Sequence, residues 1–154
     1  MTCQPSWIRG GGVVAHLHPE DQDWQLPDEA VPLATFHITL IGRKSFLGKD
    51  DAMAAVWAEV ASTLPEPPRA ELASEVHQQA EDDRLTWFLH LVNQKEFTCY
   101  VEQLTNILDD AFQKTSGIRF ENPENARYFH MTIGNNQGGD PMKSIGSIRQ
   151  PQGL

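Results

Sequence analysis

The chain is poor in cysteine and in positive charge. Among its 154 residues the cysteines are Cys3 and Cys99, too few for a disulfide framework and in no metal-binding spacing. Lys and Arg number 12 against 21 Asp and Glu, which gives a net charge of −9. Proteins that hold long DNA or RNA usually present a basic surface, so this deficit argues against such a partner. It does not exclude a small anionic ligand.

Long apolar runs and common nucleotide-binding patterns are also missing. No segment has the length and hydrophobicity of a signal peptide or a membrane span, so we expect a cytoplasmic protein with no membrane partner. The patterns GxGxxG and GK[ST] are absent. With 40% hydrophobic and 21% charged residues, the composition is that of a single globular domain over residues 1–154.

The order of expected elements indicates an α+β fold. Alternating or β-rich patterns predict strands at residues 13–17, 36–41, 69–79, 85–92, 118–120 and 129–133. We expect loops at residues 19–32 and from Asn135 onward, and a polar turn at 78–83. Strand runs interrupted by two helices favour helices outside antiparallel sheets.

Helical spacing predicts the two helices. The first covers residues 50–63 with Asp50 as its N-cap, and the second carries an apolar stripe from Phe97 to Phe112. Asn93 and Glu96 resemble a capping box, and Gly117 suits the residue that closes the second helix. Cys99 lies among the apolar residues of this helix, and we expect it in the core.

Two segments of the chain repeat one pattern. Phe36-His37-Ile38-Thr39-Leu40 recurs as Phe129-His130-Met131-Thr132-Ile133, 93 positions later (130 − 37). Successive side chains of a strand point to opposite faces, so the apolar residues would enter the core while His and Thr share the other face. The copies lie at comparable places in two roughly similar halves. This favours two pseudo-symmetric lobes with a central cleft.

The paired motif suits phosphoryl transfer. If both strands line one cleft, a phosphate between them meets two imidazoles on opposite sides and two threonine hydroxyls. An imidazole has a reference pKa of about 6.5, so one His can deprotonate an attacking hydroxyl while the other protonates the leaving oxygen. The threonines would hydrogen-bond the non-bridging oxygens, where charge accumulates. This chemistry requires no metal.

Two His-x-Thr motifs, each in an apolar strand and separated by most of a small chain, resemble the 2H phosphoesterase superfamily. The group includes bacterial 2′,5′ RNA ligase-like proteins, plant and fungal cyclic phosphodiesterases, and phage anti-CBASS nucleases. The resemblance implies a bilobal α+β fold and metal-independent cleavage or transfer at 2′,3′-cyclic, 2′-5′ or cyclic oligonucleotide phosphodiesters. Carried over to this sequence, it makes His37 and His130 the catalytic pair, with Thr39 and Thr132 binding phosphate. The Gly- and Asn-rich tail does not match the 2′,5′ ligase-like branch, so the substrate stays open.

Three further residues are candidates for binding the substrate. Arg43 follows the first motif and Lys143 follows the second, and a phosphate needs only a few such positive groups. Taken singly, each is also typical of a solvated surface charge. Tyr128 shares a strand face with His130, where it can stack on a base or stand as an aromatic residue at the rim.

The remaining histidines have simpler interpretations. His16 and His18 stand two positions apart on an expected strand, a spacing that can supply two metal ligands. No further ligand cluster completes such a site, so packing or cleft lining is favoured and no cofactor is expected. We interpret His77 and His90 as isolated residues that are structural or exposed.

The sequence therefore predicts a monomeric, metal-independent phosphodiesterase acting on a small nucleotide or short oligonucleotide. One alternative is a nucleotide- or RNA-end-binding module of the same fold without turnover. Another is a metal-dependent hydrolase that uses His16 and His18. A third is an RNA 2′-5′ ligase that uses the two motif histidines in reverse.

Overall fold

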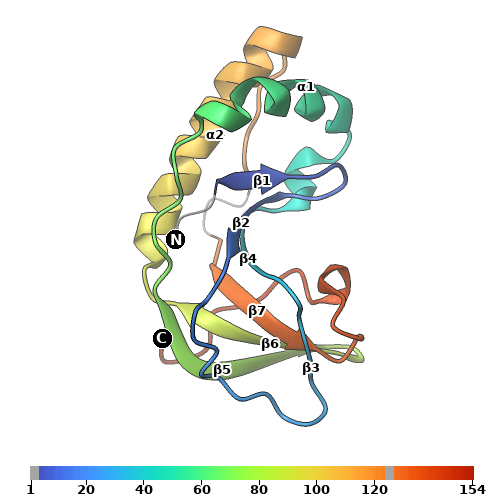
Figure 1. Ribbon diagram of the computed structural model, residues 1–154. Coiled ribbons are helices and arrows are strands. Elements are labelled where there is room, and N and C mark those ends of the chain that lie inside the picture. Colours follow the sequence, from blue (N-terminus) through green and yellow to red (C-terminus); the bar gives the residue numbers. More distant parts are fainter. Residues whose placement is uncertain (1–3, 124–126) are drawn as a thin grey trace. The chain divides into compact units, whose positions relative to one another are not determined.

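The computed structural model describes residues 4–123 and 127–154. One sheet has the strand order β1-β2-β4, from Pro5–Trp7, Val13–Leu17 and Phe36–Ile41 (Figure 1). The other has the order β3-β7-β6-β5, from Val31–Pro32, His130–Asn135, Arg84–Leu91 and Leu72–Glu81. The α-helices are α1 (Asp50–Val60) and α2 (Gln94–Ser116), with short 3-10 helices η1 (Arg43–Phe46), η2 (Ala61–Thr63) and η3 (Pro141–Lys143). The predicted α+β class is confirmed.

The chain divides into two compact units. Unit 1 comprises Met1–His16, Thr39–Arg69 and Lys95–Arg127, and unit 2 comprises Leu17–Ile38, Ala70–Gln94 and Tyr128–Leu154. The division falls inside β2 and inside β4, so each of these strands contributes residues to both units.

Helix α2 buries the predicted apolar stripe. Its buried residues are Phe97, Tyr100, Val101, Leu104, Leu108, Ala111 and Phe112, whose spacing places them on one helical face. Gly117 follows the helix with a φ of +68°, and its amide bonds the Gln113 carbonyl at 3.0 Å, as predicted for a closing glycine. Cys99 is exposed because it falls between the stripe positions 97 and 100, so its predicted core position is wrong.

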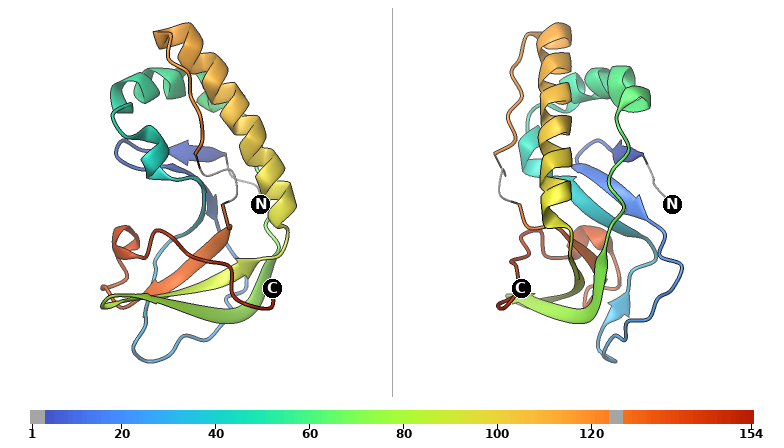
Figure 2. Two further views of the ribbon diagram at one scale, coloured as in Figure 1. Left: turned by 180° about the vertical axis from the view of Figure 1, so that it is seen from behind. Right: turned by 90° about the vertical axis from the view of Figure 1, so that its left-hand side faces the viewer.

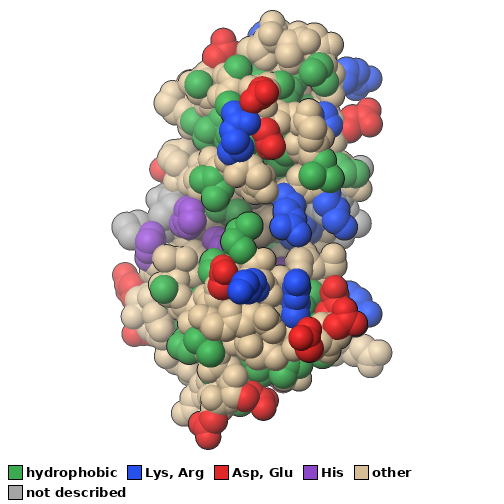
Figure 3. Space-filling view, turned by 90° about the vertical axis from the view of Figure 1, so that its right-hand side faces the viewer, with side chains coloured by type: hydrophobic (Ala, Val, Ile, Leu, Met, Phe, Trp, Pro, Cys, Tyr) green, Lys and Arg blue, Asp and Glu red, His purple; other side chains and the backbone are tan. Residues whose placement is uncertain are grey.

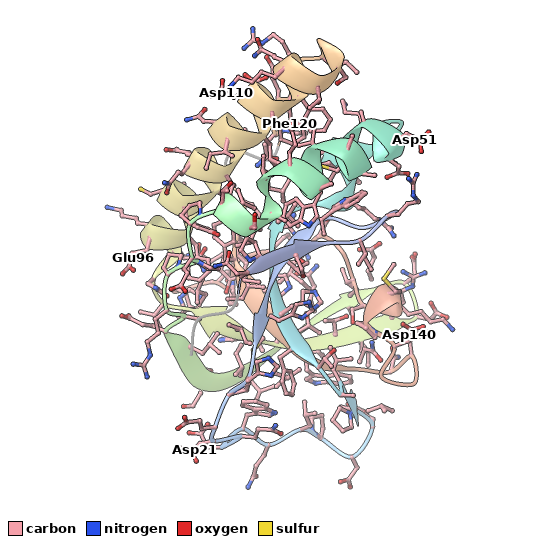
Figure 4. All side chains as sticks on the ribbon, turned by 45° about the horizontal axis from the view of Figure 1, so that its top comes forward. Asp21, Asp51, Glu96, Asp110, Phe120 and Asp140 are labelled. Atoms are coloured by element: carbon pink, nitrogen blue, oxygen red, sulfur yellow. The ribbon has the colours of Figure 1, made fainter. Side chains whose placement is uncertain are left out.

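Stacked aromatic rings fill the core of unit 1. Phe46 stacks on Phe120, and Phe120 stacks on Phe112, with ring centroids 5.3 Å apart in each pair. Figure 4 labels Phe120 beside α2. The Asp109 carboxylate of α2 accepts the Phe120 amide hydrogen at 2.8 Å. The predicted strand at residues 118–120 is therefore wrong, because a helix side chain and not a neighbouring strand takes this amide.

The start of α1 differs by one position from the sequence prediction. Lys49 is the N-cap and Asp50 is already helical, so the prediction of Asp50 as the cap is wrong. The carboxylates of Asp50 and Asp51 instead lie in the first turn, where the positive end of the helix dipole favours negative charge. The predicted end near residue 63 corresponds to η2, which continues the helix to Thr63.

The sheet of unit 2 is built on a hairpin. β5 and β6 pair antiparallel, and β7 lies on the other side of β6 (Figure 2). Glu81 pairs with Arg84, and His130 pairs with His90. The predicted polar turn at 78–83 shortens to residues 82–83, because Asp82 adopts a φ of +55° that closes a two-residue turn. Buried Leu89, Leu91 and Met131 supply one side of the core.

Strand β3 falls in a segment that the sequence predicts as loop. Val31 pairs with Asn135 and Pro32 with Gly134, and the Leu33 amide then donates to the Ile133 carbonyl at 3.0 Å. Gly134 allows this approach, since a Cβ there would lie 3.1 Å from the Val31 carbonyl oxygen. β3 thus holds the chain that leads to the first motif against the strand of the second.

Candidate functional site

The first motif lies in β4 with the alternation that the sequence predicts. Phe36, Ile38 and Leu40 are buried, and His37 and Thr39 are half-buried between them. The Phe36 ring packs edge-to-face on Trp24 with centroids 5.5 Å apart. β4 is an edge strand of its sheet, and the division between units falls after Ile38. His37 therefore belongs to unit 2 and Thr39 to unit 1.

The second motif lies at the start of β7, an inner strand between β3 and β6. Met131 and Ile133 are buried, while His130 and Thr132 are half-buried and belong with His37 to unit 2. The buried Phe129 that precedes the strand is held by the Gln94 side chain. Gln94 Oε1 accepts the Phe129 amide hydrogen at 2.9 Å, and Gln94 Nε2 donates to the Phe129 carbonyl at 2.7 Å.

The two histidines are approached by chain segments that lie side by side. Leu33 bonds Ile133, His37 lies four residues beyond Leu33, and His130 lies three residues before Ile133. Because β3 and β7 are antiparallel, the chain leaves β3 toward the end of β7 at which His130 lies, and it bends at residues 34–35 before β4 begins. An extended chain spans at most about 3.5 Å per residue, so His37 lies within about 14 Å of Leu33 and His130 within about 10 Å of Ile133.

His130 belongs to a group of rings on one face of the unit 2 sheet. The ring cluster consists of His77 on β5, Phe88 and His90 on β6, Tyr128, and His130 on β7. Tyr128 lies nearly parallel to both His90 and His130, with centroids 5.7 Å and 6.1 Å apart. Phe88 makes a T-shaped contact with the His130 ring at 5.5 Å and stacks on His77 at 5.7 Å.

A hydrogen bond ties two members of the ring cluster together. The Tyr128 hydroxyl lies 2.7 Å from Nδ1 of His90. Burial raises the pKa of Tyr128 to about 12, so its hydroxyl keeps its proton near neutral pH. Burial, and then the charge of His77, lowers the pKa of His90. The lowered pKa favours a neutral His90 near pH 7, and the tautomer of its ring decides which of the two groups donates the hydrogen bond.

The tail after η3 is anchored on the same face of the sheet. Ile145 and Ile148 form a buried apolar group with Phe88, against which Tyr128 packs. The Ile145 amide donates to the Thr86 hydroxyl at 3.0 Å. Gln79 on β5 bonds the tail twice, since its Nε2 donates to the Ser147 carbonyl and its Oε1 accepts from the Arg149 amide, each at 2.8 Å.

The glycine-rich loop between β7 and η3 is organised by the buried side chain of Asn135. Its Oδ1 accepts the amide hydrogens of Gln137 and Gly139, each at 2.9 Å. Its Nδ2 donates to the Asp140 carbonyl at 2.9 Å, and Asp140 lies just before η3 (Figure 4). Two amides of this loop are therefore already used within the loop.

The remaining candidates lie at the surface. Arg43 in η1 and Lys143 in η3 are exposed, the first in unit 1 and the second in unit 2, and His16 and His18 are exposed as well. Cationic and anionic side chains are interspersed on the face in Figure 3, and histidines reach the surface there.

Over residues 4–123 and 127–154, no three His, Cys, Asp or Glu side chains are placed to hold a metal ion. Within the same ranges, no helix has the length and hydrophobicity to cross a membrane.

The prediction that His77 and His90 are isolated is wrong, because both belong to the ring cluster. A signal was available for His90, because Leu89-His90-Leu91 repeats the apolar–His–apolar pattern of both motifs.

No family model matches the chain, and no curated protein or solved structure matches it significantly.

Proposed function

We propose that this protein is a metal-independent phosphodiesterase in which His37 and His130 act as general acid and base. The observation that carries the proposal is the hydrogen bond from Leu33 to Ile133, with the antiparallel β3–β7 pairing around it. It leads the chain that precedes His37 out of β3 toward the end of β7 at which His130 lies. Both imidazoles are half-buried, which suits groups that exchange protons with a bound ligand.

The proposed reaction is an in-line displacement at phosphorus. One imidazole takes a proton from water as the oxygen of that water bonds to phosphorus. The other imidazole gives a proton to the leaving oxygen as its bond to phosphorus breaks. Thr39 and Thr132 donate hydrogen bonds to the non-bridging oxygens. The products are a phosphomonoester and a free hydroxyl, and proton exchange with solvent restores both histidines.

The proposed substrate is a small nucleotide or short oligonucleotide with a 2′,3′-cyclic, 2′-5′ or cyclic oligonucleotide phosphodiester. The net charge of −9 favours a short anionic ligand over a long polyanion. Arg43 and Lys143 are exposed cations that we assign to binding its phosphates. The proposal includes the two-lobed domain expected from the sequence, with the motif strands lining its central cleft.

The test is a panel of these phosphodiesters incubated with the protein in EDTA, with products identified by mass spectrometry. We expect hydrolysis of at least one substrate. His37→Ala and His130→Ala are each expected to lower kcat/KM by at least about 100-fold, the usual contribution of a general acid or base. Asn106→Ala, an exposed change on α2, is the control and is expected to keep full activity. Full activity in either histidine variant would contradict the proposal.

The same panel separates the alternatives. Loss of activity in chelator with recovery on adding zinc would favour a metal-dependent hydrolase, to be checked by His18→Ala and elemental analysis. Tight binding with the ligand recovered unaltered would indicate a binding module. Joined oligonucleotides in place of cleaved ones would indicate a ligase.

A further inference from the structure

Tyr128 is fixed in place by contacts on several sides. Its hydroxyl lies 2.7 Å from Nδ1 of His90, and its ring packs on the apolar group of Phe88, Ile145 and Ile148. The ring of His130 lies nearly parallel to it, with an interplanar angle of 13°. A tyrosine held in this way has little freedom to rotate, so it limits the rotamers open to its neighbour.

The His130 ring is confined from two directions. Tyr128 is nearly parallel to it at 6.1 Å, and Phe88 and His130 meet in a T-shaped contact at 5.5 Å with an interplanar angle of 74°. His90 stands opposite His130 in the β6–β7 ladder and completes the group across the strands. The Nδ1 atom of His130 is buried, so exchange of a proton with a ligand falls to Nε2.

We propose that His90 and Tyr128 are positioning residues for His130, an inference that rests on the proposed function of His130. The hydrogen bond between Tyr128 and His90 fixes the tyrosine ring, and that ring fixes the plane of the His130 imidazole. Nε2 of His130 is thereby aimed at the reacting phosphodiester. Correct aim of a proton-transfer group lowers the barrier to the chemical step, so the effect is expected on kcat and not on KM.

The protonation states agree with this role. Tyr128 keeps its proton at neutral pH, since burial raises its pKa to about 12. The proposal assigns His90 the tautomer with no proton on Nδ1, so the Tyr128 hydroxyl donates to that atom. His90 is neutral, because burial and the charge of His77 lower its pKa. The titratable groups around His90 are His77, Tyr128 and His130. His77 on β5 lies in turn 3.8 Å from the Glu75 carboxylate.

The first test compares two tyrosine variants. Tyr128→Phe keeps the ring and removes the hydroxyl, and we expect kcat to fall about tenfold with KM unchanged. Tyr100→Phe is the matched control, because the buried Tyr100 hydroxyl also makes a 2.7 Å hydrogen bond, to the Pro65 carbonyl in unit 1. It is expected to lower stability and leave kcat unchanged. An unchanged kcat in Tyr128→Phe, as expected of a residue that only stacks on a base, would overturn the inference.

The second test uses rescue at His90. Gln can accept a hydrogen bond from the Tyr128 hydroxyl and does not titrate, whereas Leu can do neither. We expect His90→Gln to keep kcat within about threefold of wild type and His90→Leu to lower it about tenfold. Equal kcat in the two variants would contradict a role that acts through the hydrogen bond.

The third test needs no turnover, so it separates failure of this inference from failure of the proposed function. Nitrogen-15 NMR of the imidazoles reports tautomer and environment. In Tyr128→Phe, we expect the ring resonances of both His90 and His130 to shift, while Tyr100→Phe leaves both in place. If the wild type hydrolyses no phosphodiester, the proposed function fails while these shifts still measure the coupling. Unchanged His130 resonances in Tyr128→Phe would contradict the inference.

Discussion

Replacing Gln94 should weaken the fold and the second motif together. The Gln94 side chain makes hydrogen bonds to the Phe129 amide, the Phe129 carbonyl and the Leu91 carbonyl, at 2.9, 2.7 and 2.7 Å. Phe129 is 2% exposed and immediately precedes His130, so these bonds fix the entry to β7. Gln94→Ala removes all three partners at once.

The magnitude follows from the cost of unpaired polar groups. A hydrogen bond contributes about 1 kcal/mol net, and a buried group left without a partner costs about 1–3 kcal/mol. Water can reach part of this half-buried position, so we expect the free energy of unfolding to fall by roughly 2–4 kcal/mol. For a chain of this size, that lowers Tm by roughly 5–15 °C.

The measurement is urea unfolding followed by circular dichroism. The kcat of each variant is measured without urea, at a temperature where that variant is folded. Gln94→Glu keeps an acceptor for the Phe129 amide, but its carboxylate has no hydrogen to donate to the Phe129 and Leu91 carbonyls. At neutral pH it should lower the free energy of unfolding at least as much as Gln94→Ala. In acid the carboxyl group gains a proton to donate, so part of the stability should return. Gln103→Ala, an exposed change on the same helix, is the control. A change of less than about 0.5 kcal/mol in Gln94→Ala, the usual size of a surface substitution, would refute this reasoning.

Two further predictions concern unit 2. Because the folded-state pKa of His90 is lowered by burial and by His77, the unfolded chain binds more protons below about pH 6.5, and stability should fall as pH drops through that window. Urea midpoints between about pH 5 and 7.5 should show a smaller slope in His90→Gln, and an equal slope would count against the assignment. Gly139→Ala should cost roughly 2–3 kcal/mol, since φ is +73° and the new Cβ would lie 2.8 Å from the Pro32 carbonyl oxygen. Gly138→Ala, at a φ of +72° in open space, should cost only about 1 kcal/mol, and thermal melts that rank the two in the opposite order would contradict the packing argument.

The elements that were predictable from sequence are those whose patterns are local. The alternation of buried and half-buried residues in both motif strands follows from the period of a strand, and it held from Phe36 to Leu40. The apolar stripe of α2 was predictable for the same reason. Cys99 was misplaced because its neighbours in sequence are apolar while its position on the helix faces outward.

The features that were not predictable depend on partners distant in sequence. Val31 and Pro32 form a strand only because β7 lies beside them, and a proline-containing pair carries no strand signal by itself. The pattern Leu89-His90-Leu91 indicates a strand position for His90, but it does not reveal which rings lie beside it. Its place beside Tyr128 follows from the register that sets it opposite His130, which only the pairing of β6 with β7 defines.

The hydrogen bonds from Gln79 to the tail determine which positions there tolerate substitution. The amide of Gln79 bonds main-chain atoms of residues 147 and 149, so the identity of those two side chains is irrelevant to the contact. We expect natural and engineered substitutions to be tolerated at Ser147 and Arg149, where both side chains are exposed. At Gln79, any side chain that cannot both give and receive a hydrogen bond should free the main chain of residues 147 and 149, while Ile145 and Ile148 keep their own contacts.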